Sequence, residues 1–140
     1  MDILCTGCDS VLKKKQKKYC SNQCQGDHQY RVYISEWLAG NRSGEQYEGE
    51  VSNHVRRWLF DQHDSKCETC GWNEVNPTTG KVPLTVNHIN GDWSNHRPEN
   101  LQLICPNHHS LTPNYGSLNR GNGRRHRLAK IHENKEKARN

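Results

Sequence analysis

The chain has 140 residues, enough for one compact domain with appendages and too few for two large cores. Only 31% of the residues are hydrophobic and the mean hydropathy is −1.13, so we expect metal ions or disulfides to stabilise a small core. No apolar run approaches the roughly 20 residues of a membrane span, so we expect no membrane partner. Residues 1–10 lack the apolar core of a signal peptide. We therefore expect a cytoplasmic protein whose seven cysteines bind metal rather than form disulfides.

The net charge of +5 is unevenly distributed along the chain. Five lysines between residues 13 and 18 carry +5. Residues 120–140 carry +6, with eight lysines and arginines against two glutamates, so the rest of the chain carries −6. Basic segments at both ends favour binding to a polyanion, because neutralised phosphates release counterions. Charge runs are also common as solvated tails, which is the alternative for each run.

Residues 1–24 form a module bounded by cysteines. Its two short pairs are Cys5-x2-Cys8 and Cys20-x3-Cys24. Two ligands from each turn can meet one tetrahedral ion, so we predict a four-thiolate zinc site. The lysines would then lie at the tip of a fixed knuckle, in a position to contact a phosphate backbone. A disulfide or the remnant of a lost metal site is the alternative.

A helical connector is expected over residues 25–66. In its first half the apolar and aromatic residues recur at intervals of three and four, which predicts a helix over residues 25–38 that ends near Gly40. The residues that set this spacing are Tyr30, Tyr33, Ile34, Trp37 and Leu38. Residues 41–50 predict a loop, and Ser52 is a candidate N-cap for a second helix. The buried side of that helix would carry Val55, Trp58 and Leu59.

Residues 67–112 predict a β-hairpin followed by a short helix. The expected segments are a strand over residues 82–89, a turn-rich loop over 90–100 and a second strand over 101–104. Pro106 suits the first turn of a helix and Pro113 its end. The chain then continues as a basic tail over residues 119–140, with a weak helical signal in 124–138.

The same region carries a second set of metal-ligand residues in two pairs. They are Cys67, Cys70, Cys105 and His108. Three thiolates and one imidazole at these spacings predict a tetrahedral zinc site, and four protein ligands leave no open position on the ion. The zinc would therefore be structural. Free buried cysteines are the alternative.

Three stretches of this region together resemble the signature of the HNH endonucleases. They are Val86-Asn87-His88-Ile89-Asn90-Gly91-Asp92, Arg97-Pro98-Glu99-Asn100-Leu101 and Cys105-Pro106-Asn107-His108-His109. The resemblance covers residues 67–109 in order and spacing. It implies a metal-dependent DNA endonuclease with a ββα-metal (His-Me finger) core over residues 67–118. The fold class expected is therefore small α+β and stapled by metal, with this core preceded by helices and an N-terminal zinc module.

The resemblance also implies the roles of individual residues. His88, at the end of the first strand, corresponds to the general base that activates water, and histidine can accept a proton near neutral pH. Asn100 corresponds to the residue that braces the loop between the strands. His109 corresponds to a ligand of a divalent catalytic metal, such as Mg²⁺, Mn²⁺ or another transition metal. Neighbouring residues on a helix point about 100° apart, so His108 can face the zinc while His109 faces the groove.

One position departs from the family pattern. The residue before the general base is often an aspartate that ligates the metal, whereas this chain has Asn87. An amide oxygen is neutral and binds a divalent cation less well than a carboxylate. Either Asn87 is a weaker metal ligand or Asp92 compensates for it.

The extensions beside the core look like those of phage and prophage HNH proteins. This implies a role in phage DNA metabolism in the host cytoplasm, including genome packaging beside terminase subunits. DNA would be the substrate, and its phosphates would be contacted by Arg97, Arg120, Arg124 and Arg125. The oligomeric state, the sequence preference and the choice between nicking and double-strand cleavage stay open.

Two alternatives to a nuclease fit the sequence less well. A non-enzymatic zinc module that binds nucleic acid or protein fits the basic ends, but it gives no reason for His88, Asn100 and His109 to occur at this spacing. A zinc hydrolase that uses the ion held by the second cysteine set is disfavoured, because that site is closed.

Overall fold

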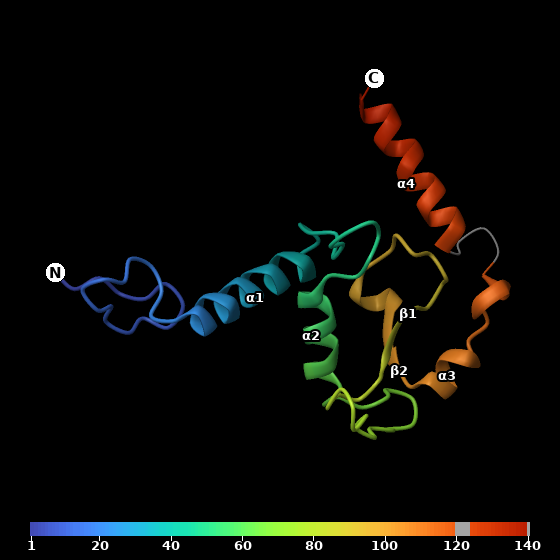
Figure 1. Ribbon diagram of the computed structural model, residues 1–140, viewed down its shortest axis with the longest axis horizontal. Helices are drawn as coiled ribbons and strands as arrows, with labels where there is room; N and C mark the ends of the chain where they lie inside the picture. The colour runs from blue at the N-terminus through green and yellow to red at the C-terminus, as the bar shows by residue number, and fades with distance from the viewer. Residues whose placement is uncertain (120–123, 140) are drawn as a thin grey trace. The chain divides into compact units, whose positions relative to one another are not determined.

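The computed structural model describes residues 1–119 and 124–139 and divides the chain into two compact units, Met1–Arg42 and Ser43–Asn140 (Figure 1). The boundary falls inside the predicted connector 25–66, and the division into four segments stays a prediction. Among the described residues, no helix is both long and apolar enough to cross a membrane.

The first unit consists of a cysteine-rich loop and helix α1 (Asn22–Leu38). Ser21 caps this helix, because its hydroxyl accepts a hydrogen bond of 3.0 Å from the backbone N–H of Cys24. The cap explains why the helix begins before the predicted residue 25. After Ala39, Gly40 takes a φ of +85°, a left-handed conformation that glycine adopts without strain, so the helix ends where the sequence predicts.

The second unit begins with a loop and helix α2 (Asn53–Gln62). The predicted N-cap is confirmed, because the Ser52 hydroxyl accepts a hydrogen bond of 3.1 Å from Val55 N–H. Val55 and Leu59 are buried and Trp58 is half-buried, as the spacing predicts. This helix therefore presents one apolar side to the rest of its unit.

A two-stranded antiparallel sheet joins β1 (Thr85–His88) to β2 (Leu101–Ile104), with His88 opposite Leu101. The first strand is shorter than the predicted 82–89. Pro83 lacks the N–H that a ladder needs, which explains the late start. On the other edge of β2, Glu68 pairs with Leu103 through its backbone N–H, and its carboxylate accepts the Leu103 N–H at 2.9 Å.

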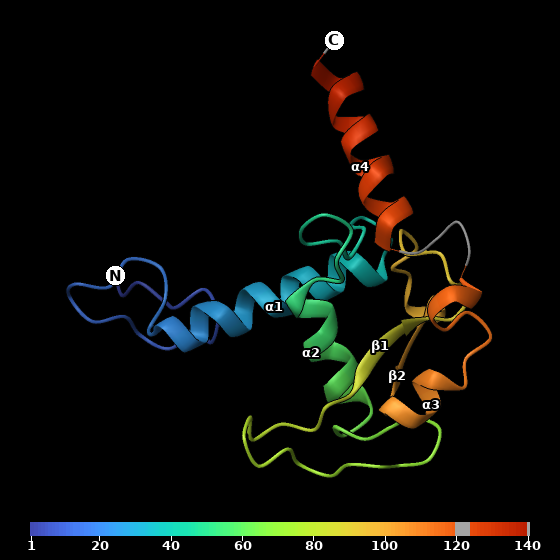
Figure 2. The ribbon, with the colours of Figure 1, turned by 45° about the vertical axis from the view of Figure 1, so that its right-hand side comes forward.

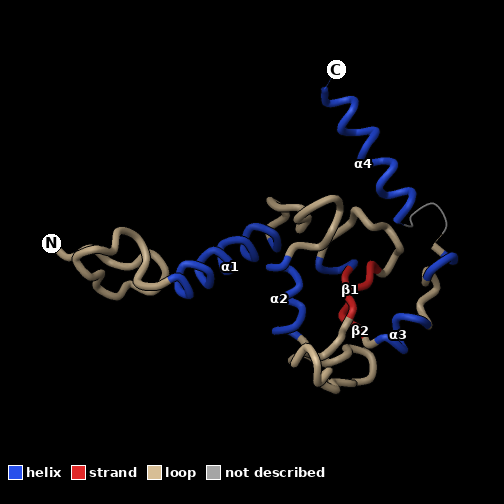
Figure 3. Tube along the Cα trace, viewed as in Figure 1, coloured by secondary structure: helices blue, strands red, loops and turns tan. Residues whose placement is uncertain are grey.

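Helix α3 (Pro106–Ser110) follows β2 directly, so the order strand, strand, helix agrees with the prediction. In both ribbon views the hairpin lies between α2 and α3, and α2 contacts β2 while α3 contacts β1 (Figures 1 and 2). Long loops precede and connect the two strands (Figure 3). The remaining described elements are the 3₁₀ turns η1 (Pro98–Asn100) and η2 (Gly116–Leu118) and helix α4 (Arg124–Arg139). The second unit is therefore a small α+β structure.

Candidate active site and metal centres

His88 is the last residue of β1, and its side chain meets a second histidine from the loop between the strands. The Nε2 atom of His88 lies 2.9 Å from Nδ1 of His96, and the ring centroids are 5.0 Å apart. His96 is only 2% exposed, whereas His88 is half-buried. The strand end thus carries a pair of imidazoles joined by a hydrogen bond.

Asn100 ties together the two sides of the loop that carries His96. Its Oδ1 accepts a hydrogen bond of 3.1 Å from Asn90 N–H, and its Nδ2 donates at 2.9 Å to the carbonyl of Asn95. Its own carbonyl accepts the N–H of Ile89 at 2.8 Å. The amide is buried, so these bonds are protected from water.

The segment after α3 returns to the same strand end. The Nδ2 of Asn114 donates to the carbonyls of His88 at 3.2 Å and Ile89 at 3.3 Å, and Nδ2 of Asn119 donates to Gly91 at 3.1 Å. Gly91 has a φ of +77°, and a Cβ there would lie 2.5 Å from Oδ1 of Asn119 and 2.8 Å from Nδ2 of Asn114. A side chain at this position would therefore disturb the hydrogen bonds that Asn114 and Asn119 make to this backbone, which we call the Asn114 and Asn119 clips.

His109 lies on α3 beside His108, and α3 contacts β1. Its ring packs edge-on against Tyr115, with centroids 5.1 Å apart and an interplanar angle of 85°. An edge-to-face contact of this kind restrains the imidazole without a hydrogen bond to its nitrogens. His109 is half-buried, so its imidazole stays reachable by a ligand.

Asn87 is buried and lies opposite Gln102 in the hairpin. Among the described residues, its Nδ2 atom has no hydrogen-bond partner. Turning the amide over about its Cβ–Cγ bond would place the oxygen at this buried position, which suits a cation ligand. Asp92 differs, because its Oδ1 already accepts hydrogen bonds from the hydroxyl of Ser94 at 2.6 Å and its N–H at 3.0 Å. These bonds hold the pKa of the Asp92 carboxyl below its usual 3.8.

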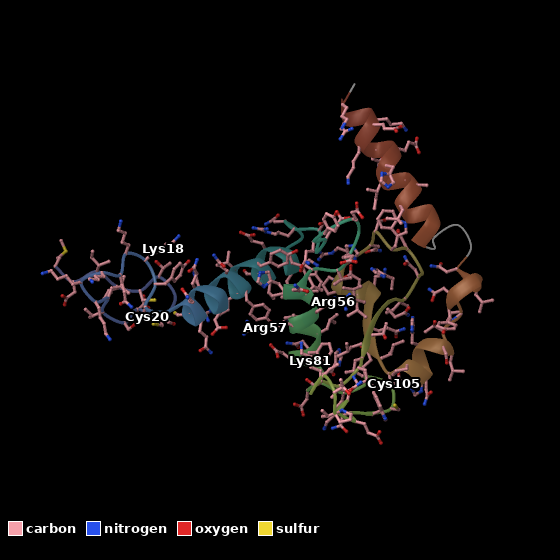
Figure 4. All side chains as sticks on the ribbon, in the orientation of Figure 1. Lys18, Cys20, Arg56, Arg57, Lys81 and Cys105 are labelled. Carbon is pink, nitrogen blue, oxygen red and sulfur yellow. The ribbon has the colours of Figure 1, made fainter. Side chains whose placement is uncertain are left out.

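The residues predicted to hold the structural ion of the core do lie together. The ligand atoms of Cys67, Cys70, Cys105 and His108 all lie within 4.8 Å of one another. Nδ1 of His108 is 3.2 Å from Sγ of Cys105 and 3.8 Å from that of Cys67, and the sulfurs of Cys70 and Cys105 are 3.9 Å apart. Figure 4 shows Cys105 where β2 passes into α3. This set could hold a metal ion.

The four cysteines of the first unit also converge. The ligand atoms of Cys5, Cys8, Cys20 and Cys24 lie within 4.8 Å of one another. The sulfurs of Cys5 and Cys24 are 3.5 Å apart, and those of Cys8 and Cys20 are 3.7 Å apart. Cys20 lies just before α1 and near Lys18 in Figure 4. Among residues 1–119 and 124–139, these two sets are the groups of three or more His, Cys, Asp or Glu residues close enough to share an ion.

The electrostatics of both sets favour a cation. Burial opposes ionisation of Cys5 and Cys67, but hydrogen bonds from backbone N–H groups outweigh it and lower the pKa of each thiol to about 6. The pKa of Cys24 is instead raised to about 12, because its thiol is hydrogen-bonded to Cys5 and is partly desolvated. Ionisation of one thiol therefore opposes ionisation of its neighbour. A bound cation would offset the repulsion between the two negative charges.

The predicted phosphate contacts are only partly placed. Arg97 lies in the loop between the strands, with its Nε 3.9 Å from a carboxylate oxygen of Glu99. Arg120 lies outside the described residues, and Arg124 and Arg125 lie on α4 with side chains outside the description.

Several contacts of the site are not predictable from the sequence. The pairing of His96 with His88 and the contacts of Asn114, Asn119 and Tyr115 join residues that no local spacing relates. A hollow of about 690 Å³ in the second unit is lined by Arg56, Arg57 and Lys81 beside apolar side chains. Figure 4 labels these three residues. The adjacent arginine pair in α2 is a signal that could have pointed to this hollow.

The chain is similar to a known phage nuclease. It is 39% identical over 59 residues to the H-N-H endonuclease F-TflIV of Escherichia phage T5. The match covers 40% of this chain and 24% of that protein, so the chain spans about a quarter of the relative's length. No family model and no solved structure matches the chain. The similarity therefore concerns a stretch of 59 residues and part of an HNH endonuclease.

Proposed function

We propose that the chain is a metal-dependent DNA endonuclease of the HNH type, with a ββα-metal core formed by β1, β2 and α3. The observation that carries this proposal is that His88 ends β1 beside a loop braced by Asn100, while the helix that bears His109 contacts the same strand. The similarity to a phage HNH endonuclease supports the same reaction class.

His88 is the proposed general base. Hydrolysis of a phosphodiester needs a water molecule that loses a proton as its oxygen attacks phosphorus, while the bond from phosphorus to the leaving 3′ oxygen breaks. The imidazole at the end of β1 accepts that proton. Its half-buried position leaves it reachable from solvent while the strand and the Asn114 clip hold its backbone.

Asn100 is a positioning residue in this scheme. An amide does not titrate, so Asn100 cannot exchange a proton with water. Its oxygen and its nitrogen are both hydrogen-bonded to the backbone of the loop. It thereby fixes the segment that leads away from His88.

Asn87 and His109 are the proposed holders of the divalent catalytic metal. When bound, such an ion supplies relief of negative charge on the phosphate and the leaving oxygen. The buried, unsatisfied end of the Asn87 amide and the imidazole on α3 fit an oxygen and a nitrogen ligand. The hydrogen bonds from Ser94 to Asp92 favour Asn87 over Asp92 in this role.

The two cysteine-rich sets are proposed to hold zinc. Tetrahedral zinc with sulfur ligands at ~2.3 Å separates its sulfurs by about 3.8 Å, and the sulfur pairs measured here lie between 3.5 and 3.9 Å. Each set supplies four ligands and leaves no open position, so both ions would be structural.

DNA is the proposed substrate, held through its phosphates. Arg97, Arg120, Arg124 and Arg125 remain the candidates from the sequence, and the lysines of the first unit and the hollow lined by Arg56, Arg57 and Lys81 add further positive charge. A role in phage DNA metabolism in the host cytoplasm, beside terminase subunits, stays a prediction.

Incubation of supercoiled plasmid with the purified chain and a panel of divalent metals tests the proposal. We expect nicked or linear product with at least one metal, and a fall of about 10²–10⁴-fold in rate for His88→Ala, as is typical when a general base is lost. A non-enzymatic DNA-binding module would instead retard the plasmid on a gel without cutting it. Equal cleavage by the wild type and His88→Ala would remove His88 from the mechanism.

A further inference from the structure

We infer that His96 is a positioning residue that orients His88, by accepting a hydrogen bond from its Nε2–H and so assigning the basic lone pair to Nδ1. The expected effect of His96 on the cleavage rate rests on the proposed nuclease activity. Its structural basis is the distance of 2.9 Å between Nε2 of His88 and Nδ1 of His96.

Because His96 is buried, it can orient His88 but cannot contact DNA directly. Its side chain is 2% exposed, so it cannot reach a phosphate in solution, whereas His88 is half-buried. The two rings meet at an interplanar angle of 50°, with the nitrogens rather than the ring faces in contact. Among the reacting groups proposed, His96 therefore contacts His88.

The direction of the hydrogen bond follows from the chemistry of a base. A neutral imidazole carries one N–H and one lone pair, so a donor at Nε2 makes Nδ1 the acceptor. The water proton then moves to Nδ1 of His88, and the resulting imidazolium still donates from Nε2 to the same His96 nitrogen. His96 keeps its own proton throughout, so the step needs no rearrangement of the pair. The opposite direction would place the proton of His88 on Nδ1 and leave Nε2 facing His96 rather than the substrate.

The loop that delivers His96 is fixed on both sides of this residue. The carbonyl of Asn95 accepts the Asn100 amide at 2.9 Å, and Oδ1 of Asn95 accepts the N–H of Arg97 at 3.2 Å. The carbonyl of Arg97 in turn accepts Asn100 N–H at 2.9 Å. Asn100 therefore acts on His88 partly through His96.

The test compares His96→Asn with His96→Leu. The two replacements have nearly the same shape, but only asparagine offers an acceptor, its Oδ1, close to the former Nδ1 position. We expect the leucine variant to lose about 10- to 100-fold in the cleavage rate at saturating plasmid with little change in the half-saturating plasmid concentration, because misorientation of a catalytic group costs rate rather than binding. The asparagine variant should retain most of the rate. Circular dichroism and thermal melts check that both variants are folded.

A spectroscopic readout separates this inference from the nuclease proposal. Long-range ¹H–¹⁵N correlation spectra of the ring nitrogens in the wild-type chain should show the Nε2–H tautomer of His88, and His96→Asn should keep it while His96→Leu should not. The wild-type spectrum tests the inference even if no plasmid is cut or if the leucine variant fails to fold. A dominant Nδ1–H tautomer in the wild type, or equal rates for the leucine variant and the wild type, overturns the inference. Equal losses in both folded variants also overturn it, because the acceptor would then be irrelevant.

Discussion

The side-chain nitrogen of Asn114 lies 3.2 Å from the carbonyl oxygen of His88 and 3.3 Å from that of Ile89. Both carbonyls belong to the point where β1 leaves the hairpin. Asn119 makes a similar bond to Gly91 two residues further on. The backbone of the proposed general base is therefore held by a segment that follows α3, outside the hairpin itself.

Replacement of Asn114 by alanine should weaken this support. Hydrogen bonds of this kind contribute ~0.5–1.5 kcal/mol each, so we expect a loss of about 1–2 kcal/mol in the free energy of unfolding. The melting temperature should fall by roughly 4–8 °C per kcal/mol for a unit of this size, and plasmid cleavage should slow. Asn73→Ala, at an exposed loop position, is the matched control and should change neither quantity. Identical melts for the two variants would show that the clip contributes nothing to stability.

Gly91→Ala should be destabilising for two reasons. The φ of +77° is unfavourable for alanine by about 1 kcal/mol, and the new Cβ would displace the side-chain ends of Asn114 and Asn119. Gly26→Ala is a control with the opposite expected sign, since it lies inside α1 with nothing within 4 Å of the added Cβ. There alanine should stabilise the helix by roughly 0.5–1 kcal/mol. Chemical denaturation of both variants measures the contrast, which an equal stabilisation at both sites would refute.

Local signals account for the elements that the sequence predicts well. Ser52 and the apolar spacing of Val55 and Leu59 place α2, because capping and amphipathicity act within one helical turn or two. The cysteine pairs of both sets that could hold a metal ion likewise come together as expected, because short spacings restrict where the side chains can point.

The parts of the site that the sequence does not predict depend on contacts between segments. His96 reaches His88 only because Asn100 folds the loop back on the strand. Asn114 lies 26 residues from His88, and no periodicity relates the two positions. Such contacts follow from tertiary packing, so patterns among residues close in sequence do not predict them.

Loss of the structural ion and loss of the catalytic one should have different consequences. Cys67→Ser and Cys105→Ser should lower the melting temperature sharply, because ligands of a structural zinc contribute folding free energy directly. His109→Ala should stay folded and lose cleavage. Thermal melts and plasmid assays on the three variants check this. Cysteine variants that melt with the wild type would contradict a structural ion in the core.

The number of bound zinc ions tests the cysteine set of the first unit separately. Native mass spectrometry or elemental analysis of the wild type should find two zinc ions per chain, and Cys5→Ser should leave one. We choose Cys5 because it is fully buried and its sulfur lies 3.5 Å from that of Cys24. One ion in the wild type, unchanged in the variant, would mean that the first set does not bind zinc.

Asn87→Asp tests the departure from the HNH pattern. A carboxylate at this position should bind a hard divalent cation more tightly than the amide does, so the half-saturating Mg²⁺ or Mn²⁺ concentration for cleavage should fall. The rate at saturating metal need not rise, since tighter binding helps only where metal is limiting. Asp92→Asn is the matched comparison, because the Asp92 carboxylate already accepts two hydrogen bonds from Ser94 and should not hold the ion. Metal titrations of cleavage in both variants and the wild type separate the two candidates. A half-saturation unchanged in Asn87→Asp but raised in Asp92→Asn would move the ligand role from residue 87 to residue 92.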